Sequence, residues 1–318
     1  MPMRRTLLAT PLLLAAPALA QTGSQATAVV MPYSPGGSTD VLGRILTQGL
    51  AERLGGTFVM EHRPGATTSL GARHVAAARP DGLTLLLGTV VTFTLAPFSV
   101  RNVGYDPFTG FTHLTMLAET GFVLVAHPRL PSLPALIEAA RARPGHLAYA
   151  TWGVGSTSHL MMLNLMRATG TEMLHVPFNG SPPGLTETMA GRTDAMMSVI
   201  APARPQVEAG RLAALGVPGP TRQAALPLVP TLAELGLEGM RSPGWFSLQA
   251  PAGLPPAQAS RLAQAAADSF RTPSARALLL QNGFTETPAG PEALEARLRE
   301  DHVLHRDLLA QAGIQPEG

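Results

Sequence analysis

The chain has 318 residues, no cysteine and no lysine, and all 23 of its basic residues are arginines. These absences exclude disulfides, thiolate metal ligands, a cysteine nucleophile, a phosphate-loop lysine and a Schiff base. Without Arg4 and Arg5, 21 basic residues (23 − 2) face 21 acidic ones, so the net charge gives no indication of nucleic-acid binding.

The first twenty residues have the pattern of a secretory signal peptide. MPMRR is a short basic segment, LLATPLLLAAP is apolar, and Ala18-Leu19-Ala20 is a small-x-small cleavage site. The apolar run is too short for a membrane-spanning helix. We therefore expect residues 1–20 to be removed and Gln21 to begin an exported, periplasmic protein. The choice between Sec and Tat export stays open.

Strands and helices alternate along the mature chain, which is typical of a parallel α/β sheet. The predicted strands are 26–31, 57–62, 83–91, 121–127, 146–151, 173–178, 193–200, 211–218 and 245–251. The predicted helices lie in 41–54, 160–170, 185–191, 201–210, 260–272 and 291–313. Residues 63–78 are predicted as a Gly/Pro turn that leads into a helix, and the helix that starts at 132 is stopped by Pro144-Gly145.

One pattern of strand, glycine turn and helix occurs twice, from about 26 to 92 and from about 146 to 200. PGGSTD and RPGATTSLG in the first stretch correspond to GVGSTSH and FNGSPPGLT in the second. The repeat predicts two similarly wound domains. WFSLQAP would carry the chain back, so that the two C-terminal helices pack on the first domain.

The glycine turns lie where ligands bind in such sheets, beyond the carboxyl ends of the strands. Each precedes a helix N-terminus, which carries a partial charge of about +0.5. We expect Ser38 or Thr39 to cap the first helix and Ser156 or Thr157 the second. An anion is the expected ligand, and a carboxylate is favoured over a phosphate because PGGSTD is neither a Walker A loop nor a GxGxxG sequence. Tight turns with simple caps are the alternative.

Several polar side chains allow both a structural and a functional interpretation. For His159, a core or capping role is favoured over a ligand contact. Asp40 is interpreted as a helix-start charge rather than a general base. Arg63 would either pair with a ligand carboxylate or form a structural salt bridge. Ser156 with His159 would suggest a nucleophile and its base, but no G-x-S-x-G elbow surrounds the serine.

Two C-terminal histidines have the spacing of a metal site. They occur as His302-x-x-His305, with Asp301 and Asp307 beside them on a predicted helix. No third ligand is evident, so a solvated helix face is the favoured interpretation. We expect neither a metal nor a cofactor.

The sequence resembles the Bug-type periplasmic solute-binding proteins of tripartite tricarboxylate transporters. The matching stretches follow the family order over nearly the whole mature chain: PYSPGGSTDVLGRIL, VMEHRPGATTSLGA, ARPDGLTLLLGT, YDPFTGFTHLTML, HPRLPSLPALIEAARARPGHLAYAT, GVGSTSHL, HVPFNGSPP, LPLVPTLAELGLEG and GWFSLQAPAGLP. The resemblance implies an α/β protein with two Rossmann-like domains joined by crossing strands, the periplasmic-binding-protein (Venus-flytrap) architecture. The expected domains are 21–122 plus 245–318 and 123–244.

Carried over by position, the resemblance also implies which residues contact the ligand. They are Tyr33, Ser34, Gly36, Gly37, Ser38, Thr39, Asp40, Gly88, Thr89, Thr92, Trp152, Gly155, Ser156, Thr157, His159, Asn179, Gly180, Ser181 and Ser198. The sequence departs from the family at three of these places. Ser198-Val199 stands where many members have Asp-Asn, Asn179 where many have lysine, and Trp152 where a small residue is common. These departures leave the identity of the ligand open.

The resemblance implies an exported, monomeric binding protein, not an enzyme, that closes around a small carboxylate. Its partner would be a tripartite tricarboxylate transporter permease or a sensing system, and the sequence does not decide between them. The indole of Trp152, beside the second glycine turn, favours an aromatic or long-chain acid over a compact one such as malate. The alternative function is an exported α/β hydrolase that uses Ser156 and His159.

Overall fold

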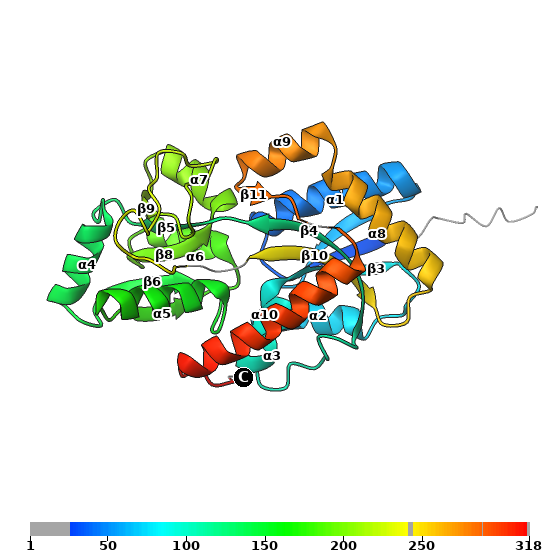
Figure 1. Cartoon of the computed structure of the whole chain (residues 1–318), viewed down its shortest axis with the longest axis horizontal. Coiled ribbons are helices and arrows are strands. Elements are labelled where there is room, and N and C mark those ends of the chain that lie inside the picture. The colour runs from blue at the N-terminus through cyan, green and yellow to red at the C-terminus, as the bar shows by residue number, and fades with distance from the viewer. Residues whose placement is uncertain (1–25, 241–243, 288, 317–318) are drawn as a thin grey trace, which may run out of the picture.

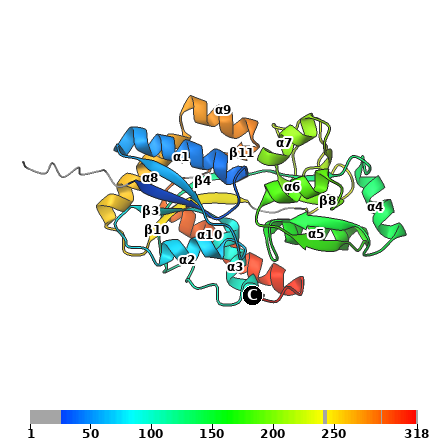
Figure 2. The ribbon, with the colours of Figure 1, turned by 180° about the vertical axis from the view of Figure 1, so that it is seen from behind.

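The computed structural model describes residues 26–240, 244–287 and 289–316, so the predicted signal peptide and the start at Gln21 lie outside the described residues. The chain forms two lobes side by side (Figure 1). The first lobe comprises the described residues of 26–120 and 244–316, and the second comprises 122–240. Each lobe has a sheet at its centre, with helices against it (Figure 2).

The sheet of the first lobe has six strands in the order β11-β4-β10-β3-β1-β2. These strands are β1 (Thr27–Met31), β2 (Phe58–His62), β3 (Thr84–Thr89), β4 (Phe111–Thr120), β10 (Trp245–Pro251) and β11 (Phe284–Thr285). Strand β1 pairs in parallel with β2 and β3, whereas β10 runs antiparallel between β3 and β4.

The sheet of the second lobe has five strands in the order β7-β6-β8-β5-β9. They are β5 (Phe122–Ala126), β6 (Ala148–Thr151), β7 (Leu174–Pro177), β8 (Ala195–Val199) and β9 (Ala213–Gly216). Strand β6 pairs in parallel with β7 and β8, and β5 runs antiparallel to β8 and β9. The predicted parallel pairing is present between β1 and its neighbours and between β6 and its neighbours. The crossing strands β5 and β10 run antiparallel to their neighbours because they enter their sheet from the other lobe.

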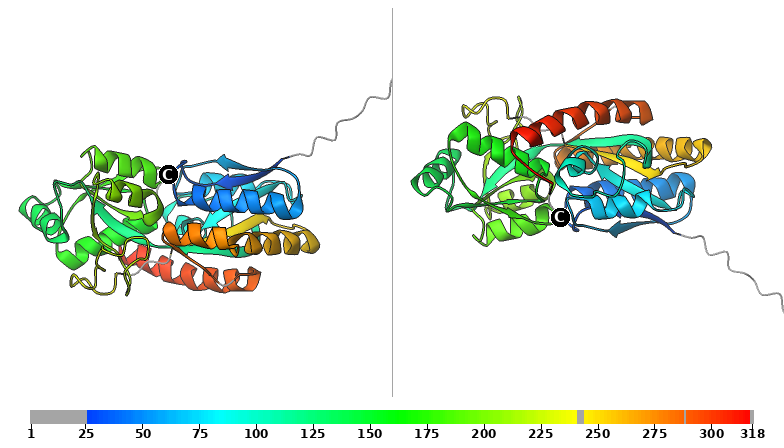
Figure 3. Two further views of the ribbon diagram at one scale, coloured as in Figure 1. Left: turned by 90° about the horizontal axis from the view of Figure 1, so that it is seen from above. Right: turned by 90° about the horizontal axis from the view of Figure 1, so that it is seen from below.

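Eleven helical segments cover these sheets in the described chain. They are α1 (Ser38–Leu54), α2 (Ser69–Ala76), the π-helix η1 (Val91–Leu95), α3 (Ala96–Ser99), α4 (Leu133–Ala142), α5 (Thr157–Thr169), α6 (Ser181–Met189), α7 (Ile200–Glu208), α8 (Pro256–Phe270), α9 (Pro273–Gln281) and α10 (Pro291–Gln311). Helix α8 packs against α1 and β4, and α10 packs against η1 and β4 (Figure 3). The prediction that the C-terminal helices pack on the first domain's elements is thus confirmed.

The apolar run LTLLLGTVV does not remain a strand to its end. Strand β3 stops at Thr89, and η1 begins at Val91 with every residue buried. A continuous apolar run has no periodicity that separates a buried strand from a buried helix. Strands β4 and β11 and helix α9, which were not predicted, complete the first lobe.

The prediction that Asp301, His302, His305 and Asp307 form a solvated face of the C-terminal helix is wrong for two of these four residues. Asp301 and His305 are buried within the first lobe at 3% and 1% exposure, because α10 turns them toward η1 and β10. Among the residues that the structure describes, no three metal-binding side chains gather into a metal site. Within the same residues, no helix is long and apolar enough to cross a membrane.

Candidate functional site

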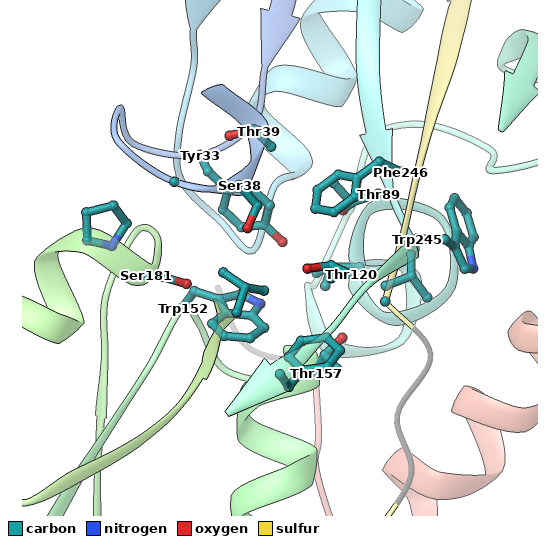
Figure 4. A pocket seen from close by; sticks show the side chains of 17 residues that line it. Tyr33, Ser38, Thr39, Thr89, Thr120, Trp152, Thr157, Ser181, Trp245 and Phe246 are labelled. Carbon is teal, nitrogen blue, oxygen red and sulfur yellow. The ribbon is translucent and has the colours of Figure 1, made fainter. Parts of the chain in front are cut away.

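A cavity lies where the two lobes meet. Figure 4 shows its lining, which consists of Tyr33, Gly37, Ser38, Thr39, Thr89, Val90, Val91, Thr120, Phe122, Trp152, Thr157, Ser181, Pro182, Val199, Gly244, Trp245 and Phe246. The two places where the chain crosses between lobes, beside Thr120 and Gly244, form part of this lining. Closing or opening the lobes would therefore change the cavity itself.

Three helix N-termini contribute to the lining, two of them from the second lobe. Helix α1 begins at Ser38, α5 at Thr157 and α6 at Ser181, and all three residues face the cavity. The first N–H groups of a helix have no partner within the helix, and the helix dipole makes this end positive. The cavity thus gathers hydrogen-bond donors that suit an anion.

The carboxylate of Asp40, in the first turn of α1, holds the turn that precedes this helix. Gly36 has φ +87°, and its N–H donates to Asp40 Oδ2 at 2.6 Å, while Asp40 Oδ1 lies 3.5 Å from His62 Nε2. Neither Gly36 nor Asp40 lines the cavity, so the expectation that both contact a ligand is not supported by this arrangement. Gly37, with φ −92°, has an ordinary backbone conformation and does line the cavity.

Three buried hydroxyl groups, in residues of α1 and α5 that line the cavity, have no protein partner among the described residues. They are Ser38 Oγ, Thr39 Oγ1 and Thr157 Oγ1, in side chains that are 5%, 1% and 1% exposed. The expected cap by Ser38 or Thr39 is therefore wrong, since Gly37 precedes α1 and the helix start has no side-chain cap. Because a buried hydroxyl without a partner costs about 1–3 kcal/mol, these groups are candidates to bind a ligand.

Helix α5 has the cap that the sequence predicts. Ser156 Oγ accepts a hydrogen bond from the backbone N–H of His159 at 3.3 Å. The imidazole Nδ1 of His159 accepts from the N–H of Gly155 at 3.1 Å, and the ring stacks on His175. Burial lowers the pKa of His159 to about 3, with a smaller contribution from His175. The favoured core and capping interpretation of His159 agrees with these contacts.

None of the described residues that line the cavity carries a formal charge. Arg63, the candidate countercharge, instead donates from Nε to Glu61 Oε1 at 2.7 Å and lies outside the lining. Burial raises the pKa of the Tyr33 phenol well above its usual range, opposed in part by a hydrogen bond to Thr89. Tyr33 is therefore a neutral O–H donor at neutral pH.

Aromatic rings from both lobes line the rest of the cavity. Trp152 is 6% exposed and stacks on Phe122, with ring centroids 6.1 Å apart and planes 16° apart. On the first lobe, Tyr33 and Phe246 face the same space, and Figure 4 shows the ring of Phe246 directed into it. Aromatic side chains from both lobes thus form apolar parts of the lining.

Eight of the implied contact residues lie in the lining, and eleven do not. The eight are Tyr33, Gly37, Ser38, Thr39, Thr89, Trp152, Thr157 and Ser181, and the eleven are Ser34, Gly36, Asp40, Gly88, Thr92, Gly155, Ser156, His159, Asn179, Gly180 and Ser198. Gly88, one of the eleven, has no Cβ and therefore leaves room for Gln249 Oε1 behind the lining.

Two of the residues outside the lining join the lobes to each other. The backbone N–H and the hydroxyl of Ser34 both donate to the carbonyl oxygen of Asn179, at 3.1 and 2.9 Å. Nearby, Thr67 Oγ1 donates to the carbonyl oxygen of Val154 at 3.1 Å. The two lobes are therefore in direct contact beside the cavity.

Nine lining residues are not among the contacts named individually: Val90, Val91, Thr120, Phe122, Pro182, Val199, Gly244, Trp245 and Phe246. Two of them, Val90 and Val91, lie within the 88–92 turn that the resemblance implies as a contact. Five of the nine lie within two positions of Thr120 or Gly244, where the chain crosses between the lobes: Thr120, Phe122, Gly244, Trp245 and Phe246. The stretches GFVLVAH and WFSLQAP are predicted as crossing strands. Because a crossing strand starts at the boundary between the lobes, this prediction could have identified the residues at their starts as part of the lining.

The fold and the cavity define the class of protein, a two-lobe α/β binding protein with a cavity between its lobes. Residues 42–312 match the family model for the tripartite tricarboxylate transporter family receptor, so the chain belongs to that family. BugT of Bordetella pertussis (strain Tohama I) is 33% identical over 251 residues, which are 76% of this chain and 76% of BugT. The resemblance to Bug-type receptors is thereby confirmed.

Two similar solved structures contain a dicarboxylate. The R. palustris Rpa4515 structure with adipate is 31% identical, has a TM-score of 0.88, and is matched over 92% of this chain and 98% of its own. MatC (Rpa3494) from Rhodopseudomonas palustris with bound malate is 30% identical, has a TM-score of 0.84, and is matched over 89% of this chain and 99% of its own.

Proposed function

We propose that this protein captures a small organic acid between its two lobes, for uptake or for sensing. The observation that carries the proposal is the convergence of three helix N-termini, with unpartnered hydroxyls, on an uncharged interlobe cavity. The adipate and malate in two similar structures support a carboxylate as the recognised group.

The carboxylate is held mainly by the backbone at the start of α1. The free N–H groups are those of Gly37, Ser38 and Thr39, since the N–H of Gly36 is already bonded to Asp40. Hydrogen bonds to a charged group contribute about 1.5–3 kcal/mol each, and a micromolar dissociation constant requires about 8 kcal/mol. Two or three such bonds together with apolar contact therefore suffice without an ion pair.

The finer parts of the proposal concern location and partners. The protein acts as a monomer in the periplasm after cleavage at about Ala20. It delivers its ligand to a tripartite tricarboxylate transporter permease or to a sensor, and it has no catalytic role. The hydrolase alternative has no support, because Ser156 is fully buried and caps α5, and its hydroxyl receives the backbone N–H of His159 rather than its ring.

A thermal-shift screen of carboxylates tests the proposal. Protein that has been denatured and refolded is used, so that a ligand retained during purification does not mask the response. A ligand at 100 times its dissociation constant adds about 2.7 kcal/mol to the free energy of unfolding. At least one aromatic or aliphatic acid should raise the melting temperature saturably and without forming a product. A screen in which only uncharged compounds stabilise the protein would contradict the proposal.

A further inference from the structure

Helix α10 presents three polar side chains to the first lobe along one face. Arg297, Asp301 and His305 are spaced four residues apart, so they project from the same side of the helix. Asp301 is 3% exposed and His305 is 1% exposed, and the Arg297 side chain is 28% exposed. None of the three lines the ligand cavity, yet each bonds to a segment that does.

The first two residues connect the helix to both chain crossings. Arg297 donates from Nη1 to Glu119 Oε1 and from Nε to Asp301 Oδ2, each at 2.8 Å. Asp301 Oδ2 also accepts the indole N–H of Trp245 at 2.6 Å. Glu119 and Trp245 are themselves direct partners across β4 and β10.

The residues next to Glu119 and Trp245 lie where the chain crosses between the lobes. Thr120 follows Glu119, Gly244 precedes Trp245, and the N–H of Thr120 donates to the carbonyl oxygen of Gly244 at 2.7 Å. Thr120, Gly244 and Phe246 line the cavity. In Figure 4 the indole of Trp245 points away from the cavity, toward the side of α10. The Arg297–Asp301 pair thus bonds to the outer side of the strand pair whose ends face the ligand site.

The third residue connects the same helix to η1. Thr94 Oγ1 donates its only hydrogen to the carbonyl oxygen of Val90 at 2.6 Å, so it accepts from His305 Nδ1 at 2.8 Å. Burial lowers the pKa of His305 to about 4, which leaves the ring neutral with its hydrogen on Nδ1. Val90 and Val91, on either side of the start of η1, line the cavity.

We propose that Arg297, Asp301 and His305 are positioning residues of the ligand site. Together they fix the three segments of the first lobe that form the hinge side of the cavity: the end of β4, the start of β10 and the start of η1. The importance of these segments for ligand binding rests on the proposed function. The bonds that fix these segments do not depend on the proposed function, because they are present in the unliganded protein.

Hydrogen exchange of the ligand-free protein, resolved by peptide, tests this role. Trp245→Phe keeps a ring but removes the N–H donor, and Asp301→Asn removes the charge that holds Arg297. Each variant should accelerate exchange at least tenfold at 117–121 and 244–249. Exchange in β8 (195–199) should be unchanged. Arg306→Gln, on the exposed side of the same helix, serves as the control and should change neither region.

Two outcomes would overturn the proposal. The first is unchanged exchange at the crossings in both variants. The second is equal acceleration in both lobes, which would indicate only a loss of overall stability. If Asp301→Asn does not fold, Trp245→Phe tests the bond between Trp245 and Asp301, and Glu119→Gln tests the bond between Arg297 and Glu119. The exchange measurement needs no ligand, so a negative result would leave the carboxylate proposal unaffected. A negative carboxylate screen would likewise leave the positioning role of Arg297, Asp301 and His305 unaffected.

Discussion

Thr39 shows how a single side chain can serve binding at a cost to stability. Its hydroxyl is buried and has no protein partner among the described residues. Thr39→Val keeps the shape but removes the hydroxyl, so it should weaken carboxylate binding by about 1 kcal/mol while leaving the unliganded protein as stable or slightly more stable. Titration calorimetry and urea unfolding would measure the two effects. Thr47→Val on the same helix, remote from the cavity, is the control, and equal losses of affinity in both variants would refute the assignment.

Trp152 tests which kind of acid the cavity accepts. Its indole lines the cavity and stacks on Phe122, so it offers a flat wall to an aromatic ligand. Trp152→Ala should weaken an aromatic acid such as benzoate by about 1 to 3 kcal/mol, and Trp152→Phe should retain most of the affinity. Equilibrium titration of folded variants would provide the comparison. An unchanged benzoate affinity in Trp152→Ala would exclude stacking on this ring.

The turn before α1 can be tested with two substitutions of Gly37, one small and one bulky. Gly37 has φ −92°, and a Cβ there would lie 3.8 Å from Pro182 Cδ, an ordinary contact. Gly37→Ala should therefore bind nearly as well as the natural protein. Gly37→Val adds two methyl groups between α1 and α6 and should reduce affinity at least tenfold. Normal binding by folded Gly37→Val would show that the ligand does not approach this backbone.

The sequence predicts most of the elements because their apolar patterns are local. The helix at 41–54 and the strands at 26–31 and 121–127 closely match α1, β1 and β5. Strand β4 was missed because FTHLTMLAET mixes threonine and histidine with apolar residues in a strand that is mostly buried. An alternating pattern predicts a strand only where one face is exposed.

Contacts between distant positions limit how much of the site the sequence can predict. The glycine turns identify the starts of α1 and α5 because the helix signals lie beside them. The buried state of Asp301 and His305 depends on Trp245 and Thr94, which are 56 and 211 positions away in the chain. Charge and spacing within one helix cannot reveal such partners, so these side chains were interpreted as solvated.

For the whole molecule, three histidines with lowered pKa values predict a loss of stability in acid. Burial lowers the pKa values of His159, His175 and His305 from 6.5 to about 3, 4 and 4. Between pH 6.5 and these values the unfolded chain binds protons that the folded chain does not. Stability should therefore be full above about pH 6.5 and fall toward pH 4.

Urea unfolding at pH 7.5 and pH 5.0 measures this dependence. The midpoint should be lower at pH 5.0, and His305→Asn, which keeps a donor but does not titrate, should lose less stability between the two pH values. Equal midpoints for the natural protein at the two pH values would show that these rings are not held neutral by burial.

The binding of one acid and of its matching amide tests the central claim most directly. Backbone N–H groups at helix N-termini recognise the negative charge of a carboxylate, whereas the apolar walls contact both compounds alike. Calorimetric titration of refolded protein with the best acid from the screen should give one site with micromolar or tighter affinity. Its primary amide should bind at least a hundredfold more weakly. Equal affinity for the acid and the amide would contradict an anion site built from the starts of α1, α5 and α6.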